Sequence, residues 1–359
     1  LVMLQVSMRQ MVRLLVHCAI LSVIAMLRQV EGKIVVNGWL VTEAEASLEH
    51  FEHILDHEIG DEFPFENLTF QSDGVSAHGA NLSSDSINIF WQVEHGIVLC
   101  SSDCPLTSCV LPGPTPGSCY HLRYEPEDGL AKYDIVIEYS LPNIHTLKQS
   151  DEYSHRVFPK ILYIPPMSFT QAVNVPLSHR TIDCLALYNT ITFTPGSRRA
   201  AILDALETAD IDVTVISNKF AVQEVEDTYR QTKVVLNTHQ KETHLTLEEF
   251  RVLPALLQGA IVVSERSAFA HVIPYHQYII FAETADLAAT IKEVLANYAY
   301  YHNLIHGPKS KLQEIFTKMR QKARVDTETA LLRVLCNSPL ALSGYAGCDD
   351  VMIVEPFGQ

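Results

Sequence analysis

The stretch Lys233 to Glu265, KVVLNTHQKETHLTLEEFRVLPALLQGAIVVSE, combines a strand, a polar loop, a helix and a second strand. The first apolar run ends at Asn237, and the second runs over 261–264. Between them, apolar residues at helical spacing predict a helix over 247–258. Short buried strands joined through a helix require a parallel sheet with right-handed crossovers. The stretch therefore predicts part of a Rossmann-like sheet.

The same alternation of strands and helices extends on both sides of this stretch. Strands are predicted at 182–188, 213–217, 234–238, 261–264 and 278–281, and helices at 197–209, 222–231, 247–258, 287–301 and 309–324. Residues 181–336 are thus predicted to form a Rossmann-like domain. Residues 337–359 show no clear period and are predicted to be a tail.

The first half of the chain is also predicted to be α/β. Strands are expected at 33–40, 87–93, 95–99, 134–139 and 160–164, with a helix over 43–57. This pattern suits a mostly parallel sheet with one long loop that disulfides shorten. The predicted fold class is α/β, with two Rossmann-like domains, 33–180 and 181–336, facing a cleft.

Length and composition exclude several classes of protein. The chain has 359 residues, of which 47% are hydrophobic and 19% charged, enough apolar surface for a core in each of two domains. This composition excludes a disordered protein. The formal net charge of -16 argues against a nucleic-acid partner, because a binder of the phosphate backbone needs an excess of cations.

Residues 1–32 resemble a targeting segment. Arg9 and Arg13 precede an apolar stretch from Leu14 to Leu27, and the predicted cleavage point is Gly32. The stretch is too short for an ordinary membrane span, so membrane contact is expected only through this segment if it stays uncleaved. The alternative is a buried helix that opens a cytosolic fold. A cleaved signal predicts the secretory pathway, and the buried helix predicts the cytoplasm.

Two further features favour an oxidising compartment. The sequons at Asn67 and Asn81 lie in a polar stretch that is expected to be a surface loop. Four cysteines crowd into a segment rich in Pro and Gly, which predicts two local disulfides without fixing their pairing: Cys100, Cys104, Cys109 and Cys119. A zinc site with His121 is the alternative, although the spacing of the cysteines is not that of a zinc knuckle. Cys184 is predicted to be a thiol in the core.

The carboxyl edge of the second sheet carries the densest chemistry. Thr246 and Glu249 have the spacing of a capping box, so the start of the following helix is expected to face this edge. Ser264 and Glu265 follow the next strand to the same edge, where Glu265 has the chemistry to bind two ribose hydroxyls. The pair Asp210 and Asp212 is interpreted as a solvated turn rather than a metal site.

The motif R-x-x-x-A-L-x-x-G-A-x-V-V-S-E, residues 251–265, resembles the donor domain of group 1 glycosyltransferases, especially the CgeB-type branch. The resemblance covers about 182–323 and includes LYNTITFTPGSRRAAILDAL, YRQTKVVLN and YIIFAETADLAATIKEVLANYAYYHNLI. It implies the GT-B fold, a nucleotide-sugar held by the second half and an acceptor held by the first. It also implies transfer with retention of anomeric configuration.

One departure from that family concerns ribose binding. Members usually carry a Glu five residues before the glycine that corresponds to Gly259, and often an acidic residue eight positions earlier. Pro254 and Thr246 occupy those places in this chain. Pro254 also removes a backbone hydrogen bond, which costs roughly 3 kcal/mol unless the helix kinks or begins later. The ribose contact has therefore moved to Glu265, or donor binding is altered or lost.

Several residues at this edge are candidates for donor binding. Arg198 and Arg199 begin a helix and suit a diphosphate, because a planar guanidinium pairs with two oxygens, but exposed arginines are equally common there. Arg251 either reaches the same phosphates or pairs with Glu248. The remaining candidates, each with a structural alternative, are Asn237, His239, His244, Thr246, Ser264 and Glu265.

The leading hypothesis is a glycosyltransferase that moves a sugar from a nucleotide-sugar to an acceptor hydroxyl of a glycan, protein or small molecule. Positive charge would stabilise the leaving diphosphate, with no metal or other cofactor. The alternatives are an inactive protein that binds a sugar-nucleotide or glycan, and a sugar-nucleotide epimerase. No two of the 15 glycines are two positions apart, which weakens a dinucleotide site, and a Walker loop is absent.

Overall fold

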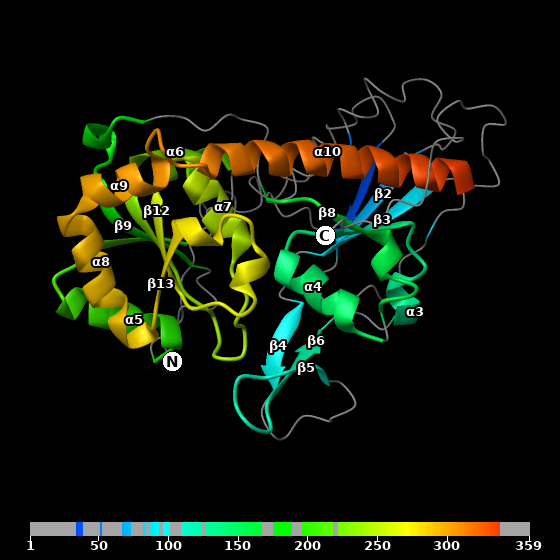
Figure 1. The fold of residues 1–359 in the computed structure, drawn as a ribbon, viewed down its shortest axis with the longest axis horizontal. Helices are drawn as coiled ribbons and strands as arrows, with labels where there is room; N and C mark the ends of the chain where they lie inside the picture. Colours follow the sequence, from blue (N-terminus) through cyan, green and yellow to red (C-terminus); the bar gives the residue numbers. More distant parts are fainter. Residues whose placement is uncertain are drawn as a thin grey trace, which may run out of the picture.

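The computed structural model describes residues 34–38, 51, 67–72, 82, 86–92, 96–100, 109–123, 127–151, 153–166, 175–188, 196–217 and 222–337. The predicted targeting segment, the sequon at Asn81 and the tail beyond Asn337 lie outside these residues. Within them, the structure contains two parallel sheets of five strands each and one antiparallel sheet of three strands (Figure 1). The predicted α/β class with two Rossmann-like sheets is confirmed.

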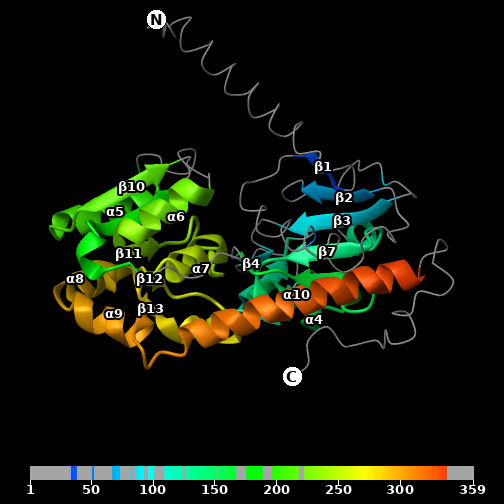
Figure 2. The ribbon, with the colours of Figure 1, turned by 90° about the horizontal axis from the view of Figure 1, so that it is seen from above.

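The first sheet has the strand order β1-β2-β3-β7-β8, and all its pairings are parallel. The strands are β1 (Ile34–Gly38), β2 (Asn67–Ser72), β3 (Ser86–Gln92), β7 (Ile135–Glu138) and β8 (Ile161–Tyr163). The arrowheads of β2 and β3 point towards the second sheet (Figure 2).

The sequon that begins at Asn67 lies at the start of the inner strand β2 and not in the expected surface loop. The strand forms here because Leu68 and Phe70 are buried in the core.

Alternate residues of these strands pack on opposite faces of the first sheet. In β3, Ile89 and Trp91 join one buried cluster, whereas Phe90 joins the other. In β7, Ile137 and Val136 divide in the same way. Both faces are covered, as the near-continuous apolar runs of a parallel sheet require.

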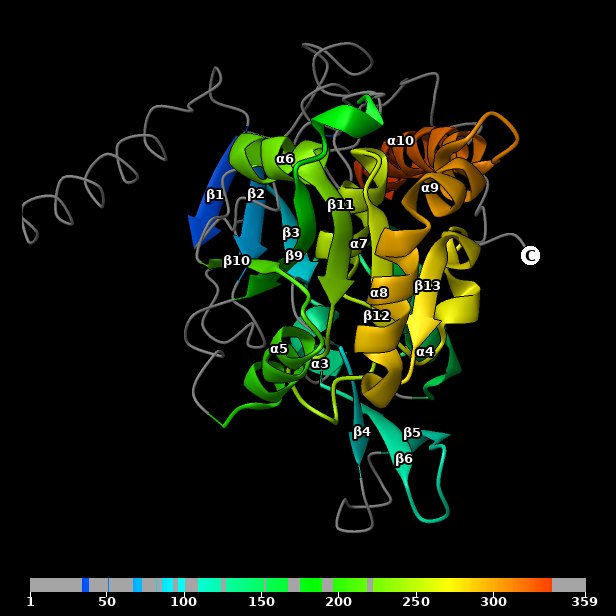
Figure 3. The same cartoon turned by 90° about the vertical axis from the view of Figure 1, so that its left-hand side faces the viewer.

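The second sheet has the strand order β10-β9-β11-β12-β13 and is also entirely parallel (Figure 3). Its strands are β9 (Ile182–Tyr188), β10 (Val213–Ser217), β11 (Thr232–Asn237), β12 (Ile261–Glu265) and β13 (Ile279–Ala282). The chain passes from β9 to β10 on one side and then returns to β11 on the other. The order therefore reverses between β9 and β11, and ligands of open α/β sheets bind at such a point.

The helices of the second half agree with the predictions except near the carboxyl end, whereas α3 and α4 were not predicted, and the helix predicted over 43–57 lies outside the described residues apart from Phe51. The helices are α3 (Glu127–Leu130), α4 (Leu141–Gln149), α5 (Arg198–Thr208), α6 (Val222–Gln231), α7 (Glu249–Leu257), α8 (Leu287–Ala296), α9 (Tyr298–His306) and α10 (Leu312–Asn337). The single helix predicted over 287–301 is interrupted at Asn297. Short 3-10 turns connect the rest: η5 (Phe158–Lys160), η6 (Leu177–His179), η8 (Ala270–Val272), η9 (His276–Tyr278) and η10 (Thr284–Asp286).

Helix α10 continues well beyond the predicted end at Arg324 and spans both halves of the molecule (Figures 1 and 2). Its first turns pack Phe316 and Met319 into the cluster that contains the second sheet. Its last turns pack Leu331 and Leu335 against the outer face of the first sheet. Burial of this apolar stripe explains why the helix extends through residues with no glycine or proline to stop it.

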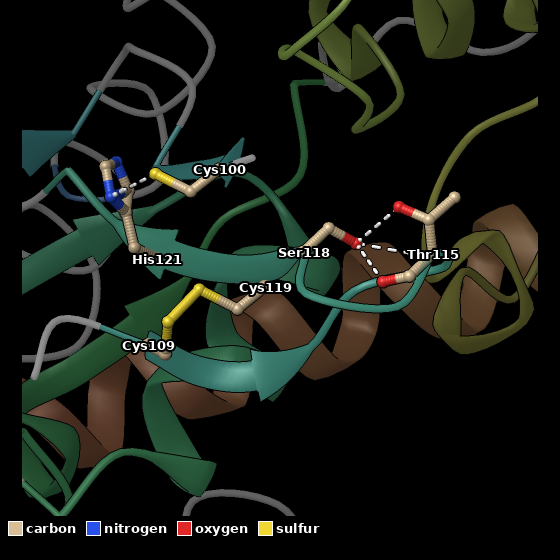
Figure 4. Close-up of a disulfide and its surroundings, with 6 residues drawn as sticks. All are labelled: Cys100, Cys109, Thr115, Ser118, Cys119 and His121. Carbon is tan, nitrogen blue, oxygen red and sulfur yellow. Dashed lines mark hydrogen bonds between the residues drawn. A yellow bond between two sulfur atoms is a disulfide. The ribbon is translucent and has the colours of Figure 1, made fainter. Parts of the chain in front are cut away.

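The expected long loop of the first half is partly a small antiparallel sheet with the order β4-β6-β5. Its strands are β4 (Ile97–Cys100), β5 (Cys109–Pro112) and β6 (Cys119–Leu122). A disulfide joins Cys109 to Cys119 (Figure 4), and Cys100 is also disulfide-bonded. The disulfide removes two thiolates that the alternative zinc site needs. Cys184 is free and buried, as predicted.

Among the helices of the described residues, none is both long and apolar enough to cross a membrane.

Candidate functional site

The candidate site lies at the carboxyl edge of the second sheet, at the reversal between β9 and β11. Tyr188 ends β9, Asn237 ends β11, and Glu265 ends β12. Helix α5 begins beside them, because Gly196 has φ +81° and Ser197 caps the helix through a hydrogen bond from the Ala200 amide. The sequence therefore brings the predicted polar residues to one edge, as a parallel sheet requires.

Arg198 is held by Glu265 in a bidentate ion pair. Nη1 of Arg198 lies 2.6 Å from Oε2 of Glu265, and Nη2 donates to Oε1. Arg198 also donates to the His239 carbonyl at 3.3 Å and to the Thr284 hydroxyl at 3.0 Å. Four of its five N–H groups are thus used within the protein.

The carboxylate of Glu265 is saturated by these contacts. It also accepts from the Thr284 hydroxyl at 2.5 Å and from the His239 amide at 2.8 Å. Burial alone would raise the pKa of Glu265, but the hydrogen bonds from Arg198, Thr284 and the His239 amide lower it. Its four acceptor positions are occupied. Ribose binding by Glu265 stays a prediction, and it would require one of these donors to leave.

Arg199 is buried beneath the edge, with 2% of its surface exposed. Its guanidinium carbon lies 4.7 Å from the centre of the Tyr188 ring, and Nη2 donates to the Thr238 carbonyl at 3.2 Å. Burial lowers the pKa of Arg199 to about 10, and the nearby Arg251 contributes. Arg199 nevertheless remains charged at neutral pH.

Glu248 lies between Arg199 and Arg251. Its Oε1 is 3.7 Å from Nη2 of Arg199 and 3.4 Å from Nη1 of Arg251. Two guanidinium groups therefore share this carboxylate. Helix α7 begins here with Glu248 at its N-cap, and the Glu248 side chain makes no capping hydrogen bond. Cations next to a helix start favour an anion.

The predicted capping box is wrong. Glu249, rather than capping α7, accepts from the Tyr275 hydroxyl at 2.7 Å and from the Leu141 amide at 3.3 Å. The helix begins at Glu249, two residues later than predicted, and Pro254 lies within it. Thr246 is buried at 2% exposure and precedes the helix.

Three other predicted residues have structural contacts. Asn237 donates to the Ser264 hydroxyl at 2.9 Å, and both side chains are fully buried. His239 is buried, and its Nε2 lies 2.9 Å from the Arg266 carbonyl. These contacts join the ends of β11 and β12.

His244 contacts the first half of the molecule. Its Nε2 lies 3.5 Å from Nη1 of Arg123, which follows β6. The neighbouring Thr243 carbonyl accepts from the Leu99 amide of β4 at 2.9 Å. The loop after β11 is therefore held by the small antiparallel sheet and not only by its own domain.

Sequence reasoning missed several residues of this region. Tyr188 covers Arg199 and shares a 2.9 Å hydrogen bond with Thr238, and Thr284 supports the ion pair of Glu265. Glu138 and Tyr275 belong to a buried network beside α7. A detectable signal existed for Glu138, because a carboxylate at the end of the apolar run Ile135–Glu138 is unusual.

The described residues contain no group of three or more His, Cys, Asp or Glu that could hold a metal ion. His121 Nδ1 lies 3.2 Å from Sγ of the disulfide-bonded Cys100 (Figure 4). Asp210 lies in a turn with φ 60°, and Asp210 and Asp212 are both exposed, which confirms the interpretation of this pair as a turn.

Comparisons with known proteins give weak similarity. No protein-family model matches the sequence, and no curated protein matches it. Among solved structures, an alpha1,3-fucosyltransferase is similar at a TM-score of 0.39 and 13% identity, covering 82% of this chain and 90% of its own. The same enzyme with GDP gives 0.38. A GtfA/B complex gives 0.40 at 11% identity, covering 80% of this chain, which spans only 60% of that one.

Proposed function

We propose that this chain is a glycosyltransferase that binds the diphosphate of a nucleotide-sugar between the starts of α5 and α7. The observation that carries the proposal is the sharing of Glu248 by Arg199 and Arg251 at the start of α7. A parallel sheet binds ligands at this edge, and a diphosphate is an anion that two guanidinium groups fit. The resemblance of residues 182–323 to group 1 glycosyltransferases supports the same substrate class.

The proposed roles of the arginines differ from the prediction from the sequence, in which Arg198 and Arg199 together bind the diphosphate. Glu265 neutralises Arg198, so Arg198 serves mainly to hold the loop at His239. Arg251 is partly exposed, with 22% of its side chain accessible, and is the cation best placed to meet a ligand. Positive charge at this position would stabilise the diphosphate as it leaves, and such stabilisation contributes several kcal/mol in a dry site.

The finer parts of the proposal come from the resemblance to group 1 glycosyltransferases and from the disulfide of the small sheet. The acceptor hydroxyl would approach from the first sheet, and the sugar would keep its anomeric configuration. The reaction would need no metal, which an assay in EDTA tests. The Cys109–Cys119 disulfide supports a protein of the secretory pathway, because disulfides persist in oxidising compartments.

The test is nucleotide release from a panel of UDP-, GDP- and ADP-sugars, with the products identified. We expect Arg251→Ala to lower kcat/KM at least tenfold and to weaken binding of the free nucleotide. Arg266→Ala is the matched control, because Arg266 forms an exposed ion pair with Glu283 and should change neither. Binding without release supports the inactive binding protein instead. Interconversion of the donor sugar without an acceptor supports an epimerase.

A further inference from the structure

A buried contact joins the start of α7 to the start of α4. Glu249 has no exposed surface, and its Oε1 accepts from the amide of Leu141, the first residue of α4. Its Oε2 accepts from the Tyr275 hydroxyl. Ser140, the N-cap of α4, also hydrogen-bonds to Glu249. One side chain thus connects helices that follow strands of the two different parallel sheets.

An aromatic pair lies directly beside this contact. The ring centres of Tyr139 and Phe250 are 4.2 Å apart. Residues 139–141 therefore pack against residues 249–250 through both an aromatic and a polar contact. The next residues on α7 include Arg251, which the proposed function places at the diphosphate, so this contact sets where the cation lies relative to the first sheet.

The side chain of Glu249 is better suited to be a neutral hydrogen-bonding group between the two helices than a buried negative charge. Burial raises its pKa to about 8, so the acid form dominates at neutral pH and can both donate and accept. The titratable groups that interact with it are Tyr275 and Tyr163, and Glu138 raises the pKa of Tyr163 as Glu249 does. The pKa values of both tyrosines are raised, first by burial, so they remain neutral. The carboxyl of Glu138 accepts from the Ser140 amide and the Asn143 side chain.

We propose that Glu249 is a positioning residue for sugar transfer. It fixes the start of α7 against the start of α4 and so holds the donor side in a fixed position relative to the acceptor side. This inference rests on the proposed function for its catalytic consequence, but the link itself is a property of the fold. Loss of the link should free both helix starts together. It should therefore weaken donor binding without touching the phosphate directly.

The experiment compares the full chain with Glu249→Ala, Glu249→Gln and the control Glu138→Gln. Hydrogen exchange is followed in peptides covering 139–147 and 249–257, and GDP, UDP and ADP affinities are measured with the same samples. We expect Glu249→Ala to speed hydrogen exchange in both peptides. We also expect it to weaken, about tenfold, the affinity for the nucleotide that the unmodified chain binds. Glu249→Gln should restore both, because an amide also donates and accepts. Glu138→Gln should speed exchange mainly in 139–147, since the hydrogen bonds that Glu138 accepts from the Ser140 amide and the Asn143 side chain belong to the first half.

Two outcomes would overturn the inference. One is faster exchange in only one of the two peptides of Glu249→Ala, and the other is unchanged nucleotide affinity despite faster exchange in both. If Glu249→Ala does not fold, the hydrogen exchange of Glu249→Gln is compared with that of Glu138→Gln. The same pattern of exchange in the two variants would also refute the inference. If no nucleotide binds the unmodified chain, the proposed function fails, and the paired exchange of the two peptides still supports or refutes the link.

Discussion

Arg198 and Glu265, 67 residues apart in the sequence, form a bidentate ion pair that ties the start of α5 to the end of β12. The pair places a neutralised arginine at the edge of the second sheet, next to two arginines that share one carboxylate. The arginines that remain candidates for a phosphate ligand are therefore Arg199 and Arg251.

The first prediction concerns the strength of this pair. Arg198→Ala should lower the free energy of unfolding by about 2 kcal/mol, because it leaves a carboxylate that is only 3% exposed with fewer donors. The partial exposure of Arg198, 23%, keeps the loss below that of a fully buried pair. Urea denaturation of Arg198→Ala, Glu265→Gln and the double variant should give a favourable coupling of about 1 kcal/mol.

The same pair predicts an acid dependence. Hydrogen bonding lowers the pKa of Glu265 below its unfolded value, so its contribution is present above pH 4.5 and disappears as pH falls through the folded pKa. For the coupling energy measured with the single and double variants, the exposed ion pair of Arg266 and Glu283 is the control and should give no comparable value. Equal coupling in the two pairs would contradict the assignment of Arg198 and Glu265 as a structural anchor.

The strands of the second sheet were predictable because their signals are local. The run Ile182–Tyr188 is buried at most positions and bounded by polar residues, so length and composition define it without tertiary information. The carboxyl edge follows from the parallel arrangement alone. The predicted residues at this edge therefore gather there, including Arg198, His239 and Glu265.

The uses of those residues were not predictable, because their partners are distant in the sequence. Thr246 and Glu249 have the spacing of a capping box, yet Glu249 bonds to Leu141, 108 residues away, and to Tyr275. The end of α10 was missed for the same reason. Leu331 and Leu335 extend the helix only because the first sheet offers them an apolar face.

The second prediction concerns Gly259, which follows α7 with φ +77°. A Cβ at this position would lie 2.4 Å from Nη2 of Arg180, which donates to the Gln258 carbonyl at 2.7 Å. Gly259→Ala should therefore cost more than the roughly 1–2 kcal/mol of the left-handed backbone alone. Gly117→Ala is the matched control, with φ +80° and no atom within 4 Å of the added carbon. Equal losses in thermal unfolding would show that Arg180 moves aside freely.

The third prediction concerns the Cys109–Cys119 disulfide of the small sheet. Replacement of both cysteines by serine should lower stability by about 2–3 kcal/mol, the loop-closure value for a short loop. Tyr120 packs against Phe269 with ring centres 4.9 Å apart, and Leu99 bonds to Thr243. Because of these contacts, exchange of the amides near 243–245 and 268–271 should also rise. Faster exchange confined to 109–123 would show that the small sheet does not support the loop after β11.

The last prediction concerns His306, whose Nε2 lies 3.0 Å from the Ala260 carbonyl. Burial lowers the pKa of His306 to about 4, although the hydrogen bond to Ala260 opposes the shift. The unfolded chain binds this proton near pH 6.5, so stability from the neutral ring is complete above pH 6.5 and falls as pH drops towards 4. Over that window the loss should be roughly 2–3 kcal/mol.

His306→Gln isolates this contribution, because an amide keeps the donor to Ala260 and does not titrate. Urea denaturation between pH 7.5 and 4.5 should show a flatter dependence for His306→Gln than for the unmodified chain. His155→Gln is the matched control, because it makes the same substitution at an exposed side chain. Parallel curves for His306→Gln and the unmodified chain would mean that the ring takes up its proton over the same pH range in the folded and unfolded chains, so that burial does not lower its pKa.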